Sequence, residues 1–106
     1  MHAPHGTVYL LHFERPITDG RPARHYIGWA FHLSSRMQQH LTGKGARLTR
    51  VAHERGIAFV IARTWSGSRS FERRLKNRKE APRLCPICRA QLPGQLVMDL
   101  EPEDLL

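Results

Sequence analysis

Residues 7–13 read TVYLLHF and residues 24–31 read RHYIGWAF, and these two stretches decide the fold. The first stretch is apolar or aromatic on both faces, which is typical of a strand covered on both sides, so we predict it as the central strand. Pro16, the pair Asp19-Gly20 and Pro22 lie between the stretches and indicate a wide turn. We therefore predict that the two strands form an antiparallel hairpin.

Two helices are expected after this hairpin. Ser34 or Ser35 is placed to cap a helix through residues 36–41, which carries Met and Leu among polar residues. A second helix fits residues 46–55, because its apolar residues recur at helical spacing and Gly56 follows as a stop signal.

A third strand and a third helix complete the predicted domain. Residues 57–62 (IAFVIA) are an unbroken apolar run, which is typical of a strand covered on both faces. An amphipathic helix is expected over residues 69–80, ending because Pro82 disfavours a helical residue before it. The order β-β-α-α-β-α predicts an α+β domain, a three-stranded antiparallel sheet flanked by helices, over residues 1–82. Residues 83–106 are then a C-terminal extension with a CxxC pair and an acidic tail.

Charge indicates the class of partner. The 106 residues include 17 Lys and Arg against 9 Asp and Glu, and four of those acids lie at residues 99–104. A basic body of this kind attracts polyanions by releasing their counterions, so nucleic acid is the expected partner. The alternative is a soluble basic protein whose arginines reflect coding bias. No signal peptide or membrane span is evident, and we expect a cytoplasmic protein.

Tyr9 and Tyr26 fall on the two strands of the predicted hairpin. Opposed residues of a hairpin have position numbers of constant sum, so a register near 35 would set the two phenols side by side. A single strand tyrosine more often packs than reacts, so the interest lies in the pair and in what accompanies it.

At these residues the sequence resembles the GIY-YIG nuclease superfamily. The first motif of that family ends in a strand tyrosine, matched by Thr7-Val8-Tyr9, and the second reads Tyr-Ile-Gly, matched by residues 26–28. Thr7 replaces the first glycine of the first motif, although Gly6 lies next to it. The resemblance covers about residues 6–81.

The resemblance also extends to the helices. The family places an arginine on the helix after the second motif, often with a histidine one turn later, and Arg36 and His40 occupy these positions. It places a glutamate on a helix after the third strand, which Glu72 matches, and some members add an asparagine, for which Asn77 is the weaker candidate.

What the resemblance implies is a metal-dependent endonuclease that hydrolyses DNA phosphodiester bonds with low sequence specificity. Glu72 would hold Mg²⁺ or Mn²⁺, and Arg36 would clamp the scissile phosphate. Tyr9 would be the water-activating base while His40 tunes it, or His40 would be the base itself, and Tyr26 would orient a water or a phosphate oxygen. The alternative for Glu72 is a surface ion pair with a lysine four residues later, and for Arg36 and His40 a solvated helix position.

The predicted third helix is densely basic, and its charge favours contact with phosphates. The alternative is a solvated helix face. Lys44, in a Gly-Lys-Gly stretch too short for a phosphate-binding loop, is interpreted as part of a turn that also faces nucleic acid. The expected nucleic-acid-binding residues are Lys44, Arg73, Arg74, Lys76, Asn77, Arg78 and Lys79.

Cys85-Pro86-Ile87-Cys88 has the spacing of half a zinc site. A tetrahedral ion needs four ligands and the chain has no second cysteine pair, so we expect reduced thiols, with zinc at Cys85 and Cys88 as the alternative. Three functions stay open: the endonuclease, a non-catalytic nucleic-acid-binding module, and a zinc-dependent interaction protein. Cleavage specificity would then come from a protein partner, from a homodimer or from DNA structure.

Overall fold

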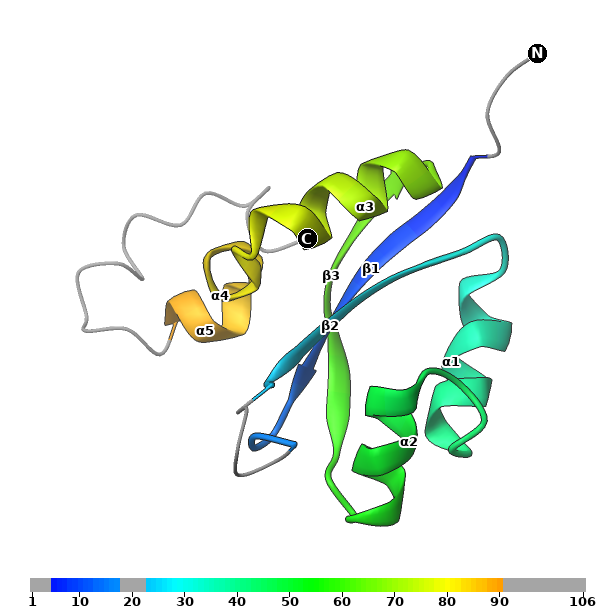
Figure 1. The fold of residues 1–106 in the computed structure, drawn as a ribbon, viewed down its shortest axis with the longest axis vertical. Coiled ribbons are helices and arrows are strands. Elements are labelled where there is room, and N and C mark those ends of the chain that lie inside the picture. Colours follow the sequence, from blue (N-terminus) through cyan, green and yellow to red (C-terminus); the bar gives the residue numbers. More distant parts are fainter. Residues whose placement is uncertain (1–4, 18–22, 91–106) are drawn as a thin grey trace.

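The computed structural model describes residues 5–17 and 23–90. Strands β1 (Gly6–Phe13), β2 (His25–Ala30) and β3 (Phe59–Gly67) form one antiparallel sheet in the order β2-β1-β3 (Figure 1). The predicted α+β class, the hairpin and the central position of the first strand are therefore confirmed.

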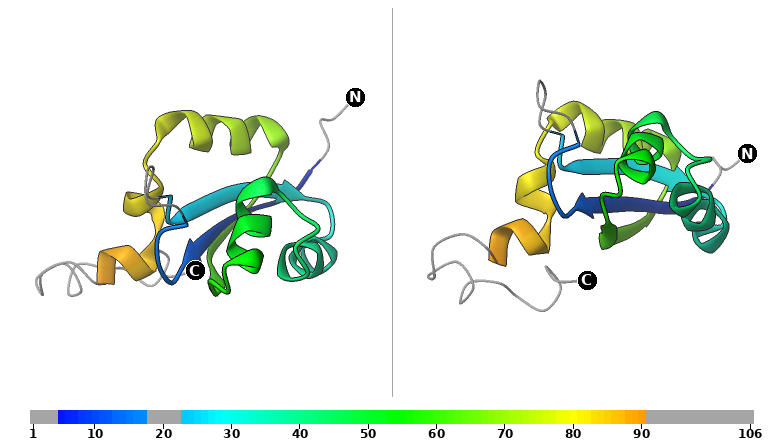
Figure 2. Two further views of the ribbon diagram at one scale, coloured as in Figure 1. Left: turned by 60° about the horizontal axis from the view of Figure 1, so that its bottom comes forward. Right: turned by 90° about the horizontal axis from the view of Figure 1, so that it is seen from below.

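Helices cover both faces of the sheet, as Figure 2 shows for α3 on one side and α1 and α2 on the other. On one face, Val8 and Leu10 pack against α3 (Arg69–Arg78), α4 (Ala81–Leu84) and α5 (Pro86–Ala90). On the other face, Tyr9, Leu11 and Phe13 pack against α1 (Leu33–Leu41) and α2 (Arg47–Glu54). Successive β1 side chains alternate between these two cores, which explains why the whole strand is apolar.

The hairpin register differs from the predicted one. Tyr9 pairs with Gly28, and Tyr26 pairs with Leu11, so the position numbers of partners add up to 37 rather than 35. Tyr26 is therefore diagonal to Tyr9 and not directly beside it. Both phenols still lie on the same face, with their ring centroids 6.2 Å apart, because Tyr9 and Leu11 are two residues apart on one strand.

The prediction that the third strand is covered on both faces is wrong. β3 is an edge strand, and Val60 and Ile61 are 53% and 42% exposed. The apolar run over residues 57–62 is divided between a loop and a strand. Ile57 packs beside Ala52 before the strand begins, and the residues from Phe59 onward pair with β1.

The first helix begins three residues earlier than predicted, and the second agrees closely with the prediction. His32 is the N-cap of α1, without a side-chain cap hydrogen bond, and Ser34 and Ser35 lie inside the first turn. Leu33 packs with Met37 against the core around Tyr9, and this contact accounts for the earlier start. The second helix is confirmed within one residue at each end.

The chain after α3 is ordered where no regular structure was predicted. α3 ends at Arg78 with Lys79 in the left-handed region (φ 54°), and Pro82 lies in the first turn of α4 instead of ending a longer helix. Cys85 is fully buried in the core formed with Val8 and Leu10, so residues 83–90 belong to the same core as the predicted domain.

The predicted acidic tail lies outside the described residues. Within the described ranges, no helix has the length and apolarity needed to cross a membrane.

Candidate functional site

A chain of hydrogen bonds runs from β1 through α1 to α2 in the interior of the protein. Tyr9 Oη lies 2.7 Å from His40 Nε2, and His40 Nδ1 lies 2.7 Å from Thr49 Oγ1. The Thr49 hydroxyl donates its one proton to the carbonyl of Ala46, 2.9 Å away. Thr49 must therefore accept from His40 Nδ1–H, which leaves His40 Nε2 as the acceptor of the Tyr9 proton. Tyr9, His40 and Thr49 are all fully buried.

Two glycines create the space that these rings occupy. A β-carbon on Gly28 would lie 2.3 Å from Tyr9 Oη, and one on Gly45 would lie 2.3 Å from His40 Nδ1. Both values are far below van der Waals contact, so neither position accepts a side chain unless the rings move. The glycine of the Tyr-Ile-Gly stretch is thus explained by its pairing with Tyr9 across the hairpin.

Arg36 and Glu72 bring charge to this buried pair of rings. Burial raises the pKa of the Tyr9 phenol, the neighbouring Tyr26 and the Glu72 carboxylate raise it further, and a hydrogen bond and positive charge from Arg36 lower it. The positive charge of Arg36 lowers the pKa of Tyr9, but burial outweighs it, so Tyr9 is protonated at neutral pH. Burial and Arg36 also lower the pKa of His40, which keeps the imidazole neutral.

Glu72 reaches this site around the open edge of β2. Lys76 Nζ lies 3.8 Å from Glu72 Oε2 and 5.3 Å from the centre of the Tyr26 ring. The ion pair that was the alternative interpretation of Glu72 is therefore present, and it lies beside Tyr26. The rings of Tyr9, Tyr26 and His40 are therefore in contact with one another, and Arg36 and Glu72 lie near enough for their charges to act on both phenols.

Two shallow pockets lie along β2 on either side of this group. One, of about 240 Å³, is lined by Arg36 and Arg69 among others, and the second, of about 270 Å³, by Tyr26, Lys76 and Lys79 among others. Arg69, whose guanidinium also stacks on Trp29 at 4.7 Å, was missed by sequence analysis. Four cationic side chains therefore border the edge of the sheet where the candidate residues meet.

The predicted nucleic-acid-binding residues do not share one face of α3. At about 100° per residue, Arg74 and Arg78 lie roughly 200° and 240° around the helix from Glu72. Arg74 stacks on Phe71 and Arg78 pairs with Glu80 at 2.9 Å. Arg73 and Asn77 are exposed.

Lys44 lies at some distance along the chain from α3, in the loop between α1 and α2. The side chain is exposed, and the backbone amide donates to the carbonyl of Gln39 at 2.8 Å. Gly43 before it has a φ of +78°, so the interpretation of this stretch as a turn is confirmed.

A second group of polar side chains lies at the opposite end of the hairpin. His12 and His25 are paired across β1 and β2, and their ligand atoms lie within 4.8 Å of the Cys85 and Cys88 sulfurs. The structure thus completes the cysteine pair to a four-residue group that could hold a metal ion, and sequence analysis missed both histidines. Burial lowers the pKa of both imidazoles, that of His25 to about 4, so both are neutral at pH 7.

The chemistry available at the β2 edge can be stated from this geometry. A protonated phenol is hydrogen bonded to a neutral imidazole, an arginine lies against the same phenol, and a carboxylate stands beside the second phenol. These groups can move a proton, bind an anion and bind a hard cation.

Comparisons of the chain with protein-family models, with curated proteins and with solved structures found no match.

Proposed function

We propose that this protein is a metal-dependent endonuclease of the GIY-YIG type that hydrolyses DNA phosphodiester bonds. The observation that carries the proposal is the meeting of Tyr9, Tyr26, Arg36, His40 and Glu72 at one edge of the sheet. These residues come from two strands and two helices and are spread over 64 positions of the sequence. Their chemical types match the needs of phosphodiester hydrolysis, which are an activated water, a clamp on the phosphate and a site for a cation.

In this proposal Tyr9 and His40 act together as the base. An attacking water gives its proton to the Tyr9 oxygen as Tyr9 passes its own proton to His40 Nε2. The hydroxide attacks phosphorus, the bond from phosphorus to one deoxyribose oxygen breaks, and the leaving oxygen takes a proton from solvent. Thr49 keeps Nδ1 of His40 as the donor and so holds the lone pair of Nε2 toward Tyr9.

Arg36 both covers the base and binds the substrate. In the free protein Tyr9 is fully buried, the positive charge of Arg36 acts on its phenol, and Arg36 Nη1 donates to the carbonyl of Trp29 at 3.5 Å. A DNA phosphate offers the guanidinium a stronger, ionic partner than the Trp29 carbonyl, so substrate binding draws Arg36 away and opens Tyr9 to water. Water activation is thereby tied to the presence of a phosphate.

Glu72 is the residue that would hold a divalent cation. Its side chain is 18% exposed, and its contact with Lys76 is long at 3.8 Å, so the carboxylate can exchange this partner for a cation. Mg²⁺ is bound in proteins by one or two carboxylates with several waters, and a single carboxylate therefore suits it. When bound, the ion would supply positive charge for the phosphoryl oxygens and the leaving group.

DNA would lie along the β2 edge. Arg69 joins Arg36 at one pocket, and Lys76 and Lys79 border the other, so the sugar-phosphate backbone meets positive charge on both sides of the reacting linkage. Backbone contacts of this kind carry no sequence information, which supports low specificity. A single site cuts one strand, so a double-strand break would need two protomers or two encounters.

The test is the nicking of supercoiled plasmid with Mg²⁺ by the wild-type protein and by Glu72→Ala. We expect the substitution to abolish nicking while DNA binding, measured by fluorescence anisotropy, is kept or strengthened because an anion is removed. Glu54→Ala, at the exposed end of α2, is the matched control and should nick like the wild type. A wild-type protein that binds DNA but leaves the plasmid intact with both Mg²⁺ and Mn²⁺ would instead favour the non-catalytic binding module.

A further inference from the structure

The four-residue group formed by His12, His25, Cys85 and Cys88 has distances that hydrogen bonding does not explain. His12 Nδ1 lies 3.3 Å from His25 Nε2, 3.5 Å from the Cys85 sulfur and 3.6 Å from the Cys88 sulfur. A ring nitrogen has either one proton or one lone pair in the ring plane, so it cannot form three hydrogen bonds at once. The three contacts at one nitrogen indicate atoms that converge on a common point.

The distances match the edges of a tetrahedron around zinc. Bond lengths of about 2.0–2.1 Å to nitrogen and about 2.3 Å to sulfur give ligand edges of about 3.3 Å between nitrogens and about 3.6 Å between nitrogen and sulfur. The observed nitrogen–nitrogen edge is 3.3 Å, and three of the four nitrogen–sulfur edges are 3.5, 3.6 and 3.2 Å. The remaining two edges, from His25 to Cys85 and between the two sulfurs, are within 4.8 Å. We propose that His12, His25, Cys85 and Cys88 bind one Zn²⁺ ion in a closed tetrahedral site.

The donor set selects zinc over a harder cation. Two imidazole nitrogens and two thiol sulfurs are ligands for Zn²⁺, whereas Mg²⁺ and Ca²⁺ take oxygen ligands. Two thiolates also cancel the charge of Zn²⁺, which suits a site where Cys85 is fully buried and His12 is 5% exposed.

The role of the ion is to fasten the C-terminal helices to the sheet. His12 and His25 lie on neighbouring strands of the hairpin, while Cys85 directly precedes α5 and Cys88 lies within it. Figure 1 shows α4 and α5 following α3 on the chain. α4 and α5 are helices of 4 and 5 residues, too short to be stable without tertiary contacts. A zinc ion shared by both elements supplies such a contact, and the site contributes to folding rather than to catalysis.

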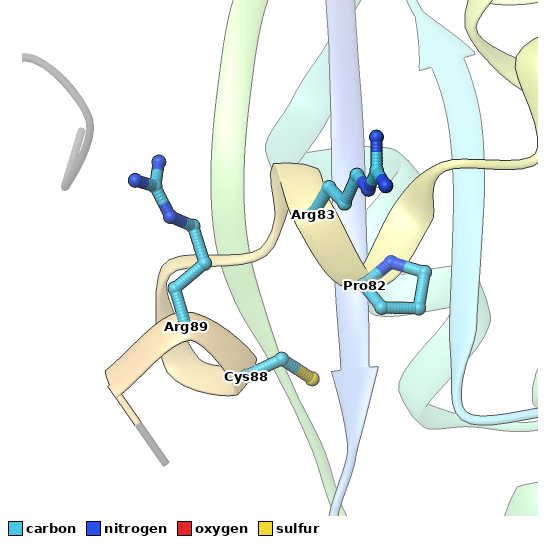
Figure 3. A pocket seen from close by; sticks show the side chains of 4 residues that line it. All are labelled: Pro82, Arg83, Cys88 and Arg89. Carbon is cyan, nitrogen blue, oxygen red and sulfur yellow. The ribbon is translucent and has the colours of Figure 1, made fainter. Parts of the chain in front are cut away.

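Solvent reaches this site from one side. A pocket of about 410 Å³ is lined by Pro82, Arg83, Cys88 and Arg89, and in Figure 3 the Cys88 sulfur points from α5 toward the sheet. This pocket gives zinc a route to the Cys88 thiol during folding and gives a chelator a route to the ion afterwards.

The experiment is a measurement of metal content, which is independent of DNA cleavage. Protein purified without chelators is analysed by inductively coupled plasma mass spectrometry, and the metal-free protein is titrated with Co²⁺. We expect about one zinc per chain and, with Co²⁺, the intense visible bands of a tetrahedral ion with thiolate ligands.

Variants assign the ligands. Cys85→Ser with Cys88→Ser, and His25→Ala, should reduce the zinc content to near zero, whereas His32→Ala, a histidine on the exposed start of α1, should keep about one zinc per chain. If the cysteine variant fails to fold, the wild-type measurements decide. A wild-type protein that holds no zinc after incubation with equimolar Zn²⁺ and shows no cobalt bands overturns the proposal, as does a soluble cysteine variant that keeps its zinc.

Discussion

Replacing Thr49 by valine removes the hydroxyl that accepts the proton of His40 Nδ1 and leaves the size of the side chain almost unchanged. Both residues are fully buried, so water cannot take the place of the lost acceptor. An unsatisfied buried N–H group costs about 1–3 kcal/mol. We expect the free energy of unfolding of Thr49→Val to fall by that amount, which is a large part of the stability of a small domain.

Urea denaturation followed by circular dichroism measures this loss, and NMR of the histidine ring nitrogens reports which of them carries the proton. Thr49→Ser is the matched control because it keeps the hydroxyl while losing a methyl group. In the wild type and in Thr49→Ser, His40 should carry its proton on Nδ1, shielded from exchange with solvent. The hydrogen-bond chain would be refuted if His40 carries its proton on Nε2 in the wild type, or if Thr49→Val unfolds at the same urea concentration.

Three further predictions concern packing, pH and salt. Gly28→Ala places a methyl group 2.3 Å from the Tyr9 hydroxyl, so we expect a loss of about 1–3 kcal/mol and a lower Tm in calorimetry; an unchanged Tm would be inconsistent with this packing. Because burial lowers the pKa of His40 in the folded state, the unfolded chain binds more protons below its ordinary pKa of about 6.5, so stability should be full above that pH and fall below it. His40→Gln should make this fall shallower in urea denaturation without abolishing it, because burial lowers the pKa of His12 and His25 as well, and an equally steep profile would count against the buried neutral imidazole. The affinity for DNA should fall linearly with salt on logarithmic axes, and binding that is insensitive to salt would exclude the backbone contacts proposed for the β2 edge.

The hairpin could be predicted from the sequence because its two strands have strong patterns, but its register could not. Eleven residues, 14–24, separate the two strands, and a separation of that length does not fix which residues pair. The predicted register was two positions away from the observed pairing of Tyr9 with Gly28. The burial of the third strand was overestimated because a continuous apolar run does not distinguish an edge strand with apolar flanks from a central one.

The five residues of the candidate active site were predicted from the sequence only because they match the motifs of a known family. Thr49 was not predicted, because its role depends on the packing of α2 against His40. The residues of the proposed zinc site show the same limit: Cys85 and Cys88 stand out by their spacing, but His12 and His25 join them only through the pairing of β1 and β2. With the register known, the cross-strand histidine pair could have been found from the sequence.

The most direct test of the proposed active site is the single-turnover rate of plasmid nicking by the wild type, Tyr9→Phe, Glu72→Gln and the variant with both substitutions. Residues that work as one catalytic unit have effects that do not add. We predict that each single substitution abolishes most of the activity and that the double variant is scarcely slower than either one. Nicking by all four proteins at the same rate would show that this group of side chains is not the site of catalysis.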